Sequence, residues 1–301
     1  MAQEELYSSP TLRVFAVVAT NSDHSRIVVS FANWLGSPSL TTFGAAERLL
    51  GPREMDAVYV NCVGNHWWQY EDLPLALEAA RCFMKPWHEV VTYGSSMGGY
   101  AAFRYAAPLD ATRAVAICPQ FSIQRTLMPQ ENRWGEELAT ISFCHEGDCK
   151  SAPDCEYLAL YDSLFRMDAM HIDEYKRYLP VKDVPLPCSG HPPLDLLLAY
   201  GTLSRVTVEL LCGTYQAARV RAEHRARRRE TARYWSELSR RLCERKHYGA
   251  IRHACERAIA LAPTKLHLQR AVMVCSIAGL RDEAAKYRER LAGIEAAEVA
   301  A

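Results

Sequence analysis

The stretch that decides the fold runs Val90-Val91-Thr92-Tyr93-Gly94-Ser95-Ser96-Met97-Gly98-Gly99-Tyr100-Ala101-Ala102-Phe103. Its first four residues are β-branched or aromatic, which favours a strand, and its last residues are small or aromatic and suit a closely packed helix. Between them lies G-x-S-x-G, with Gly94, Ser96 and Gly98 at the fixed positions. A serine on such a sharp turn needs small neighbours, because the strand and the helix approach closely there. The stretch therefore predicts that Ser96 projects from the carboxyl end of a central strand.

Short apolar runs alternate with helical segments on both sides of this stretch, up to about residue 162. The runs, each of strand length, are residues 12–18, 26–31, 57–62, 89–93, 113–118 and 156–161. Helix candidates lie between them at residues 42–50, 74–84 and 98–107. After an initial pair of strands, this alternation implies crossover connections. It predicts an α/β fold whose mostly parallel sheet is covered by helices on both faces.

From about residue 194 the pattern becomes helical, and we expect two domains, residues 1–214 and 215–301, with a cap-like insertion at about 120–154. Five residues of the second domain fall at the spacings of a tetratricopeptide repeat: Trp235, Leu238, Tyr248, Ala258 and Pro263. A weaker unit follows, and two units are fewer than such repeats need for independent stability. We therefore expect the tail to pack on the first domain, on a protein partner or on a second copy of the chain.

Charge and hydropathy exclude several function classes. Thirty-five basic residues balance thirty-five acidic ones, so the chain has no net positive charge that would attract nucleic acid. The Arg-rich residues 219–246 fit a solvated helix with the i,i+4 pairs Glu223–Arg227 and Glu237–Arg241. No nucleic-acid partner is therefore expected. No apolar run approaches the roughly 20 residues that cross a bilayer, so no membrane span is expected. The first ten residues show no secretory signal, which predicts a cytoplasmic location. Because the cytoplasm is reducing, we expect the 11 cysteines to be mostly reduced thiols.

The elbow segment resembles the α/β-hydrolase superfamily, and the resemblance covers about residues 10–205. More narrowly, residues 94–103 together with Cys118-Pro119-Gln120-Phe121-Ser122-Ile123 resemble bacterial hydrolase-like proteins associated with cell-surface glycan biosynthesis. The superfamily implies a serine nucleophile followed along the chain by an acid and then by a histidine. It also implies an oxyanion hole. Its donors would be the backbone N–H of Met97 and that of Ala32 or Asn33, in the loop after the strand at residues 26–31.

The expected base is His191, which lies in a Gly- and Pro-rich loop before a helix, whereas the other histidines lie before Ser96, in the insertion, in a helix or in the tail. Two aspartates follow the last predicted strand. We favour Asp168 as the acid that orients the histidine, because it lies one loop beyond the strand and just before a helix, as the acid often does in the resembled superfamily; its alternative role is a helix N-cap. Asp162, at the end of the strand itself, is the second choice and could instead cap a turn.

These assignments predict a serine esterase or deacylase that works through an acyl-enzyme. Its substrate would be a small-molecule or glycan ester. The alternatives are an O-acyltransferase acting on a glycan or lipid acceptor, and a non-catalytic interaction protein that uses its tail. No cofactor is expected, and no metal, because the spacing of Cys144, Cys149 and Cys155 lacks the tight pairs of zinc sites. Candidate substrate-binding residues are Trp67, Trp68, Phe121 and Trp134.

Overall fold

The computed structural model describes residues 2–147 and 149–300, and the chain forms two compact units. Unit 1 contains the chain up to Tyr161, together with Arg166–Pro185 and Ser204–Tyr215. Unit 2 contains Asp162–Phe165, Leu186–Leu203 and the chain from Gln216 onward. The break after Tyr215 lies next to the boundary expected from the sequence. Two short segments expected in the first domain group instead with the C-terminal helices.

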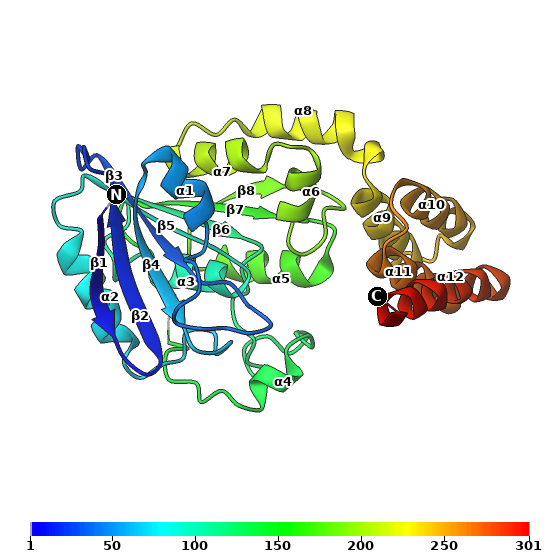
Figure 1. Cartoon of the computed structure of the whole chain (residues 1–301), viewed down its shortest axis with the longest axis horizontal. Coiled ribbons are helices and arrows are strands. Elements are labelled where there is room, and N and C mark those ends of the chain that lie inside the picture. Colours follow the sequence, from blue (N-terminus) through cyan, green and yellow to red (C-terminus); the bar gives the residue numbers. More distant parts are fainter. Residues whose placement is uncertain (1, 148, 301) are drawn as a thin grey trace. The chain divides into compact units, whose positions relative to one another are not determined.

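Unit 1 is built on one sheet with the strand order β1-β2-β4-β3-β5-β6-β7-β8 (Figure 1). The strands are β1 Ala2–Ser8, β2 Leu12–Val18, β3 Arg26–Phe31, β4 Asp56–Cys62, β5 Glu89–Ser95, β6 Arg113–Ile117, β7 Glu156–Tyr161 and β8 Val181–Pro185. β2 pairs antiparallel with β1 and β4, and every other pair is parallel. β5 lies at the centre of the sheet, as the alternation predicted.

Helices cover both faces of this sheet. The helices of unit 1 are α1 Glu47–Leu50, α2 Leu73–Phe83, α3 Met97–Arg104, α4 Gly135–Leu138, α5 Arg166–Tyr175 and most of α7 Leu203–Cys212. Thr92 Oγ1 donates to a carbonyl of α3 at 2.7 Å, while the Tyr93 hydroxyl hydrogen-bonds to Thr207 on α7. Because successive strand residues point to opposite faces, α3 and α7 lie on opposite sides of β5. The predicted fold, that of an α/β-hydrolase sheet with C-terminal helices, is confirmed.

Two strands and one helix differ from the sequence prediction. β1 and β8 were not predicted, because each is an edge strand of largely polar or charged sequence that lacks an apolar run. The helix predicted at residues 42–50 shrinks to Glu47–Leu50 and continues as a 3₁₀ turn through Pro52. Gly44 lies outside it, packed so closely on Tyr59 that a Cβ atom would clash with that ring.

Unit 2 is helical apart from its loops. Its helices are α6 Leu194–Ala199, α8 Ala217–Arg227, α9 Ala232–Glu244, α10 Tyr248–Leu261, α11 Lys265–Ile277 and α12 Arg281–Ala300. α9 packs on α10 and α11 packs on α12, around a core that includes Ile251, Leu268 and Tyr287. The predicted helical tail is present, and its tetratricopeptide pattern stays a prediction. Within residues 2–147 and 149–300, no helix combines the length and the apolar character needed to cross a bilayer.

The Arg-rich segment differs from the solvated helix that was expected. It comprises α8, a 3₁₀ turn and α9. Glu237 is only 3% exposed and forms ion pairs with Arg233, Arg240 and Arg270, whereas its predicted partner Arg241 pairs with Glu244. The pattern of charges indicated a helix correctly but not that one of its acids is buried.

Candidate active site

Ser96 occupies the turn between β5 and α3. Its backbone has φ 53° and ψ −115°, a positive φ that residues other than glycine rarely adopt. Its N–H donates to the carbonyl of Ile117 on β6 at 2.8 Å, which fixes the turn against the neighbouring strand. Backbone strain of this kind persists only where the surrounding structure enforces it, and it is concentrated at functional sites. The predicted order of strand, serine and helix is the one that the structure shows.

Gly94 and Gly98 allow this turn to close. A Cβ atom on Gly94 would lie 2.2 Å from the carbonyl carbon of Gly98, and one on Gly98 would lie 2.6 Å from the carbonyl oxygen of Phe31. Both distances are too short for any side chain. The glycines are therefore required by the close approach of strand, helix and the β3 end, as the motif predicted.

Gln120, in the loop after β6, contacts the Ser96 hydroxyl. Its Nε2 donates to Ser96 Oγ at 3.0 Å, and the opposite arrangement, with Ser96 donating to Oε1, spans 3.4 Å. The shorter distance favours the amide as the donor. Gln120 is fully buried, and the Tyr175 hydroxyl donates to its carbonyl at 2.9 Å. The sequence carries no signal for this contact, since a lone glutamine belongs to no motif of the elbow.

One predicted oxyanion donor fits the geometry and the other does not. Met97 is the first residue of α3, so its N–H has no partner within the helix. The N–H of Ala32 donates instead to the carbonyl of Val60 on β4 at 3.0 Å, because the parallel pairing of β3 with β4 continues one residue past Phe31. This engaged N–H argues against Ala32 and leaves Asn33, the other residue that the sequence allowed, as the candidate donor. Asn33 also lies at the elbow, where its Oδ1 accepts from the N–H of Ser95 at 3.0 Å.

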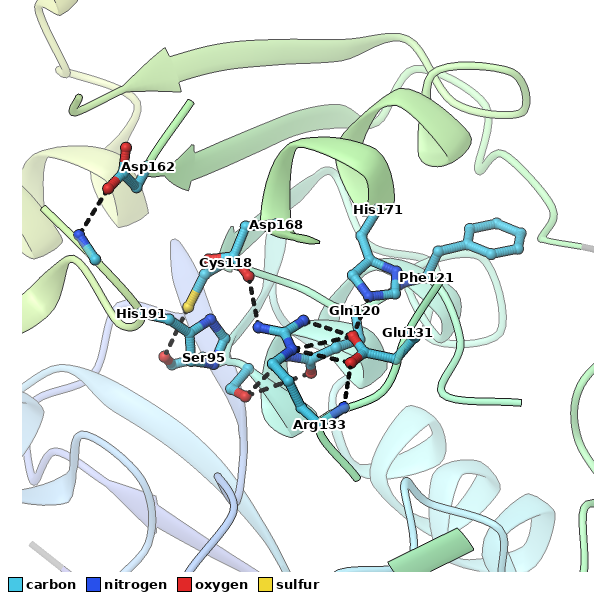
Figure 2. A network of polar contacts seen from close by, with 12 residues as sticks. Ser95, Cys118, Gln120, Phe121, Glu131, Arg133, Asp162, Asp168, His171 and His191 are labelled. Carbon is cyan, nitrogen blue, oxygen red and sulfur yellow. Dashed lines mark hydrogen bonds and ion pairs between the residues drawn. The ribbon is translucent and has the colours of Figure 1, made fainter. Parts of the chain in front are cut away.

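Asp168 lies in a buried network of charges (Figure 2). It is the third residue of α5, within the first turn rather than at the N-cap. Arg133 Nη1 donates to its Oδ1 at 3.0 Å, and the same guanidinium donates through Nη2 to Glu131 at 2.6 Å. Burial alone would raise the pKa of Glu131, but hydrogen bonds from His171 and Arg133 hold that pKa well below its usual range. Glu131 and Arg133 belong to the insertion, which therefore supports the proposed acid.

His171 completes this network and is a structural histidine. Its Nδ1 accepts from the N–H of Phe121 at 3.0 Å, so Nε2 carries the proton and donates to Glu131 at 2.8 Å. Burial is the main reason that its pKa is lowered, although Glu131 opposes the shift. With both ring nitrogens engaged and no exposed surface, His171 is a poor candidate for a general base. The sequence placed it in a helix and gave it no partner.

Asp162, the second choice for the acid, holds backbone amides. It follows the last residue of β7 and belongs to unit 2. Its Oδ1 accepts from the N–H groups of Leu164 and Cys188, both at 2.9 Å, and its Oδ2 accepts from that of Gly190 at 2.8 Å. Because both oxygens are engaged in a fully buried site, Asp162 suits the anchoring of a loop better than the orienting of an imidazole.

His191 lies in the loop between β8 and α6, in unit 2. It is half-buried, its ring centroid lies 6.2 Å from that of Phe165, and its carbonyl accepts from Arg233 Nη2 at 3.2 Å. Ser96 and Asp168 belong to unit 1.

The predicted substrate-binding aromatics divide into buried and accessible residues. Trp67 and Trp68 are fully buried, and Phe121 is 6% exposed and packs on Tyr175. These three residues therefore belong to the packed interior rather than to a surface that a substrate could contact. Trp68 Nε1, for example, donates to the carbonyl of Met97 at 3.1 Å. Trp134 is half-buried and stays a candidate for contact with substrate.

Trp34 joins Trp134 as an accessible aromatic and was not among the predicted residues. It follows Asn33 directly, is 41% exposed, and its ring centroid lies 6.4 Å from that of Trp134. Its Nε1 donates to Glu137 on α4 at 2.7 Å. The insertion and the loop after β3 thus bring two indole rings close to each other, and Trp34 follows the residue that contacts the elbow.

The chain was compared with known families, curated proteins and solved structures. No model of a known protein family matches the chain, and no curated protein matches it. Among solved structures, the capsule O-acetyltransferase of Neisseria meningitidis serogroup A is 10% identical, with 67% of this chain and 94% of that one covered and a TM-score of 0.46. FphF, a fluorophosphonate-binding serine hydrolase of Staphylococcus aureus, is 17% identical, with coverages of 70% and 98% and a TM-score of 0.42. The S-formylglutathione hydrolase FrmB of Staphylococcus aureus is 15% identical, with coverages of 70% and 98% and a TM-score of 0.42. The strand order and the serine turn of the chain itself define the α/β-hydrolase fold.

Proposed function

We propose that the protein is a serine hydrolase that cleaves carboxylic esters through an acyl-enzyme. The observation that carries the proposal is the strained backbone of Ser96 between β5 and α3, with Met97 at the first position of the helix. A scaffold has no need of such a turn. The chain order of the resembled superfamily supplies the other roles, with Asp168 as the acid and His191 as the base.

The reaction follows from these roles. Ser96 Oγ attacks the ester carbonyl while His191 takes its proton, and the N–H groups of Met97 and Asn33 stabilise the oxyanion of the tetrahedral intermediate. Collapse of the intermediate breaks the ester bond, and His191 returns the proton to the departing alcohol. Water, activated by the same histidine, then releases the acid from Ser96. Gln120 donates to a lone pair of Ser96 Oγ and leaves the hydroxyl proton for the base.

Acyl transfer to a glycan or lipid alcohol is the second candidate. It shares the acyl-Ser96 intermediate and differs only in which hydroxyl reaches that intermediate. The exposed ring of Trp34 and the half-buried ring of Trp134 favour this candidate, because they offer an apolar surface on which a sugar or an acyl chain could pack. We rank hydrolysis first.

A protein partner or a second copy of the chain stays a proposal for the helical tail. On α11, Leu266, Met273 and Ile277 are 49%, 43% and 63% exposed, which supports an interaction through this helix. If that were the sole function, the serine turn would be chemically inert.

Labelling with a fluorophosphonate, followed by peptide mapping, tests the proposed function. We expect the probe to modify Ser96, and we expect Ser96→Ala to lose ester hydrolysis by a factor of about 10⁴ to 10⁶ in kcat. Ser95→Ala is the matched control, since Ser95 is the adjacent buried serine. Labelling that persists in Ser96→Ala would show that another residue is the reactive nucleophile and would overturn the Ser96 assignment. A folded protein that is never labelled would leave only the interaction function.

A further inference from the structure

We infer that α8 and α9 of the helical tail position His191, by holding the loop at residues 187–191 through the side chains of His224 and Arg233. The inference rests on the proposed function, since it takes His191 as the base. All contacts that carry it lie within unit 2.

Side chains from the two helices bind three of the five carbonyl groups of the loop. His224 on α8 lies with its Nε2 3.0 Å from the carbonyl oxygen of Pro187. Arg233 on α9 donates through Nε to the carbonyl of Ser189 at 3.0 Å and through Nη2 to that of His191 at 3.2 Å. One rigid guanidinium therefore spans the residues on either side of Gly190.

The two remaining residues of the loop are held through their N–H groups. Cys188 and Gly190 both donate to the carboxylate of Asp162. Each residue from 187 to 191 thus has a backbone group bound to a side chain, although the loop has no regular secondary structure. Such a network restricts the loop far more than chain connectivity alone does.

Arg233 is itself fixed by buried charge and by close packing. Glu237, one turn further along α9, lies 3.9 Å from the Arg233 guanidinium, 3.0 Å from that of Arg240 and 3.1 Å from that of Arg270. Burial alone would raise the pKa of Glu237, but the surrounding arginines hold that pKa below its ordinary value. Glu237 is therefore an anionic anchor for Arg233.

Gly190 shows how closely α9 approaches the loop. Its φ is +75°, and a Cβ atom there would lie 2.7 Å from Arg233 Nη2 and 2.8 Å from Glu237 Oε1. Glycine is favoured by the positive φ, and any other residue here would displace the ends of the Arg233 and Glu237 side chains or the loop itself. The helix and the loop are fitted to each other at the residue next to the proposed base.

This arrangement gives the tail a role in the chemistry. A general base acts only when its nitrogen is within hydrogen-bond reach of the proton that it removes, and a misplacement of about 1 Å can cost a hundredfold in rate. Arg233, His224 and Asp162 touch no reacting atom in the proposed mechanism. They are positioning residues.

The test compares Arg233→Ala with Arg241→Ala in the full-length chain. Arg241 lies on the same helix and pairs with Glu244 rather than with the loop. We expect Arg233→Ala to lower kcat for a small ester, and the rate of Ser96 phosphonylation, by about tenfold to a hundredfold per titrated active site. KM should be unchanged, Arg241→Ala should match the wild type, and Arg233→Lys should recover part of the loss.

Both changes are then repeated in His191→Ala, which separates positioning from a structural role. If Arg233 acts through the imidazole, its removal costs nothing further once His191 is absent. An equal loss in both backgrounds, or full activity of Arg233→Ala in the presence of His191, would overturn the inference. A wild-type rate in His191→Ala would instead overturn the base assignment in the proposed function.

Gly190→Ala is the second perturbation, for the case in which Arg233→Ala unfolds. It keeps every charged residue and disturbs the contact of the loop with Arg233 and Glu237, because either the loop or the ends of these side chains must move. A loss of phosphonylation rate that depends on His191 supports the inference, and a wild-type rate in the folded variant contradicts it.

Discussion

Gln120 Nε2 lies 3.0 Å from Ser96 Oγ, and it donates a hydrogen bond to the oxygen that is proposed to attack the substrate. As the proton of Ser96 leaves, that oxygen gains negative charge, and a donor already in place becomes more favourable. Gln120 therefore does more than fill space beside the elbow. Its position after β6 follows from the hydrogen bond of its carbonyl with the Tyr175 hydroxyl.

Gln120→Met should lower kcat by about tenfold to a hundredfold, the value of a hydrogen bond to a charged group. Gln120→Glu should cost more, because a carboxylate repels the developing charge. Gln124→Met, in the same insertion, is the control. The measurement is the pre-steady-state rate of acylation, and an unchanged rate in both Gln120 variants would remove this residue from the mechanism.

Asp168→Asn and Asp162→Asn should fail in different ways. The first should lower kcat by about 10⁴ if Asp168 sets the tautomer of the base. The buried ion pair with Arg133 predicts a lower melting temperature as well.

Asp162→Asn should affect mainly the loop that bears His191. An amide replaces one acceptor oxygen with a donor that faces a backbone N–H, at a cost of about 1–3 kcal/mol in the free energy of unfolding. Rates per titrated active site distinguish the two variants. If Asp162→Asn lost the larger factor per site, the acid would have to be reassigned to Asp162.

Removal of the arginine beside Asp168 should destabilise the protein. Arg133→Met leaves the buried carboxylates of Asp168 and Glu131 without their shared cation, which typically costs about 3–5 kcal/mol. Arg125→Met, at an exposed position of the same insertion, should cost less than about 0.5 kcal/mol. Urea denaturation at neutral pH measures the free energy of unfolding of both variants. Equal values for Arg133→Met and Arg125→Met would show that the charge network does not stabilise the insertion.

The stability of the protein should fall as pH decreases from about 6.5 to 4, in part through His224. Burial, with a contribution from Arg228, lowers the pKa of His224 to about 4, so its imidazole stays neutral in the folded state while that of the unfolded chain takes up a proton below its ordinary pKa. Because the unfolded state binds more protons in this window, the contribution of His224 to the free energy of unfolding is fully present above about pH 6.5 and is lost as the pH falls toward 4.

His224→Gln tests the assignment. The full shift corresponds to about 3 kcal/mol, and the variant should lose that part of the pH dependence while His171 keeps its own. Denaturant midpoints measured across this range provide the comparison. A variant with the wild-type slope would show that His224 is accessible to protons in the folded state.

The central sheet and the elbow were predictable because local patterns encode them. The apolar run that became β5 and the glycines around Ser96 act within a few residues, and each has one physical meaning. β1 and β8 were not predictable, because a strand at the edge of a sheet can be polar and then shows no apolar run in the sequence. The Asp168 network was missed for another reason, since Glu131 and His171 are forty residues apart and no spacing rule joins them.

The contact of α9 with the His191 loop could not be predicted, because the charged residues of α9 look like those of a solvated helix. Glu237 fits an ordinary solvated i,i+4 pair in the sequence, and only the fold shows that it is buried among three arginines. Ala32 illustrates the same limit at the other side of the site. The sequence allowed two backbone donors in the loop after β3, and only the pairing register with β4 decides which N–H is already used.

The last prediction concerns whether water or an alcohol takes the acyl group from Ser96. With an acyl donor and a panel of alcohols and sugars, we expect free acid to exceed transferred ester, because nothing in the proposed mechanism excludes water. Trp34→Ala should reduce whatever ester is transferred to a sugar or lipid alcohol and leave hydrolysis unchanged, since its exposed ring beside Trp134 offers a surface to an acceptor and not to water. Phe43→Ala is the matched control, as Phe43 is 66% exposed and packs on Arg48 instead. Product partitioning by chromatography gives the ratio of acid to ester directly. If transferred ester dominates at modest acceptor concentration and falls in Trp34→Ala, the hydrolase assignment fails and the O-acyltransferase stands in its place.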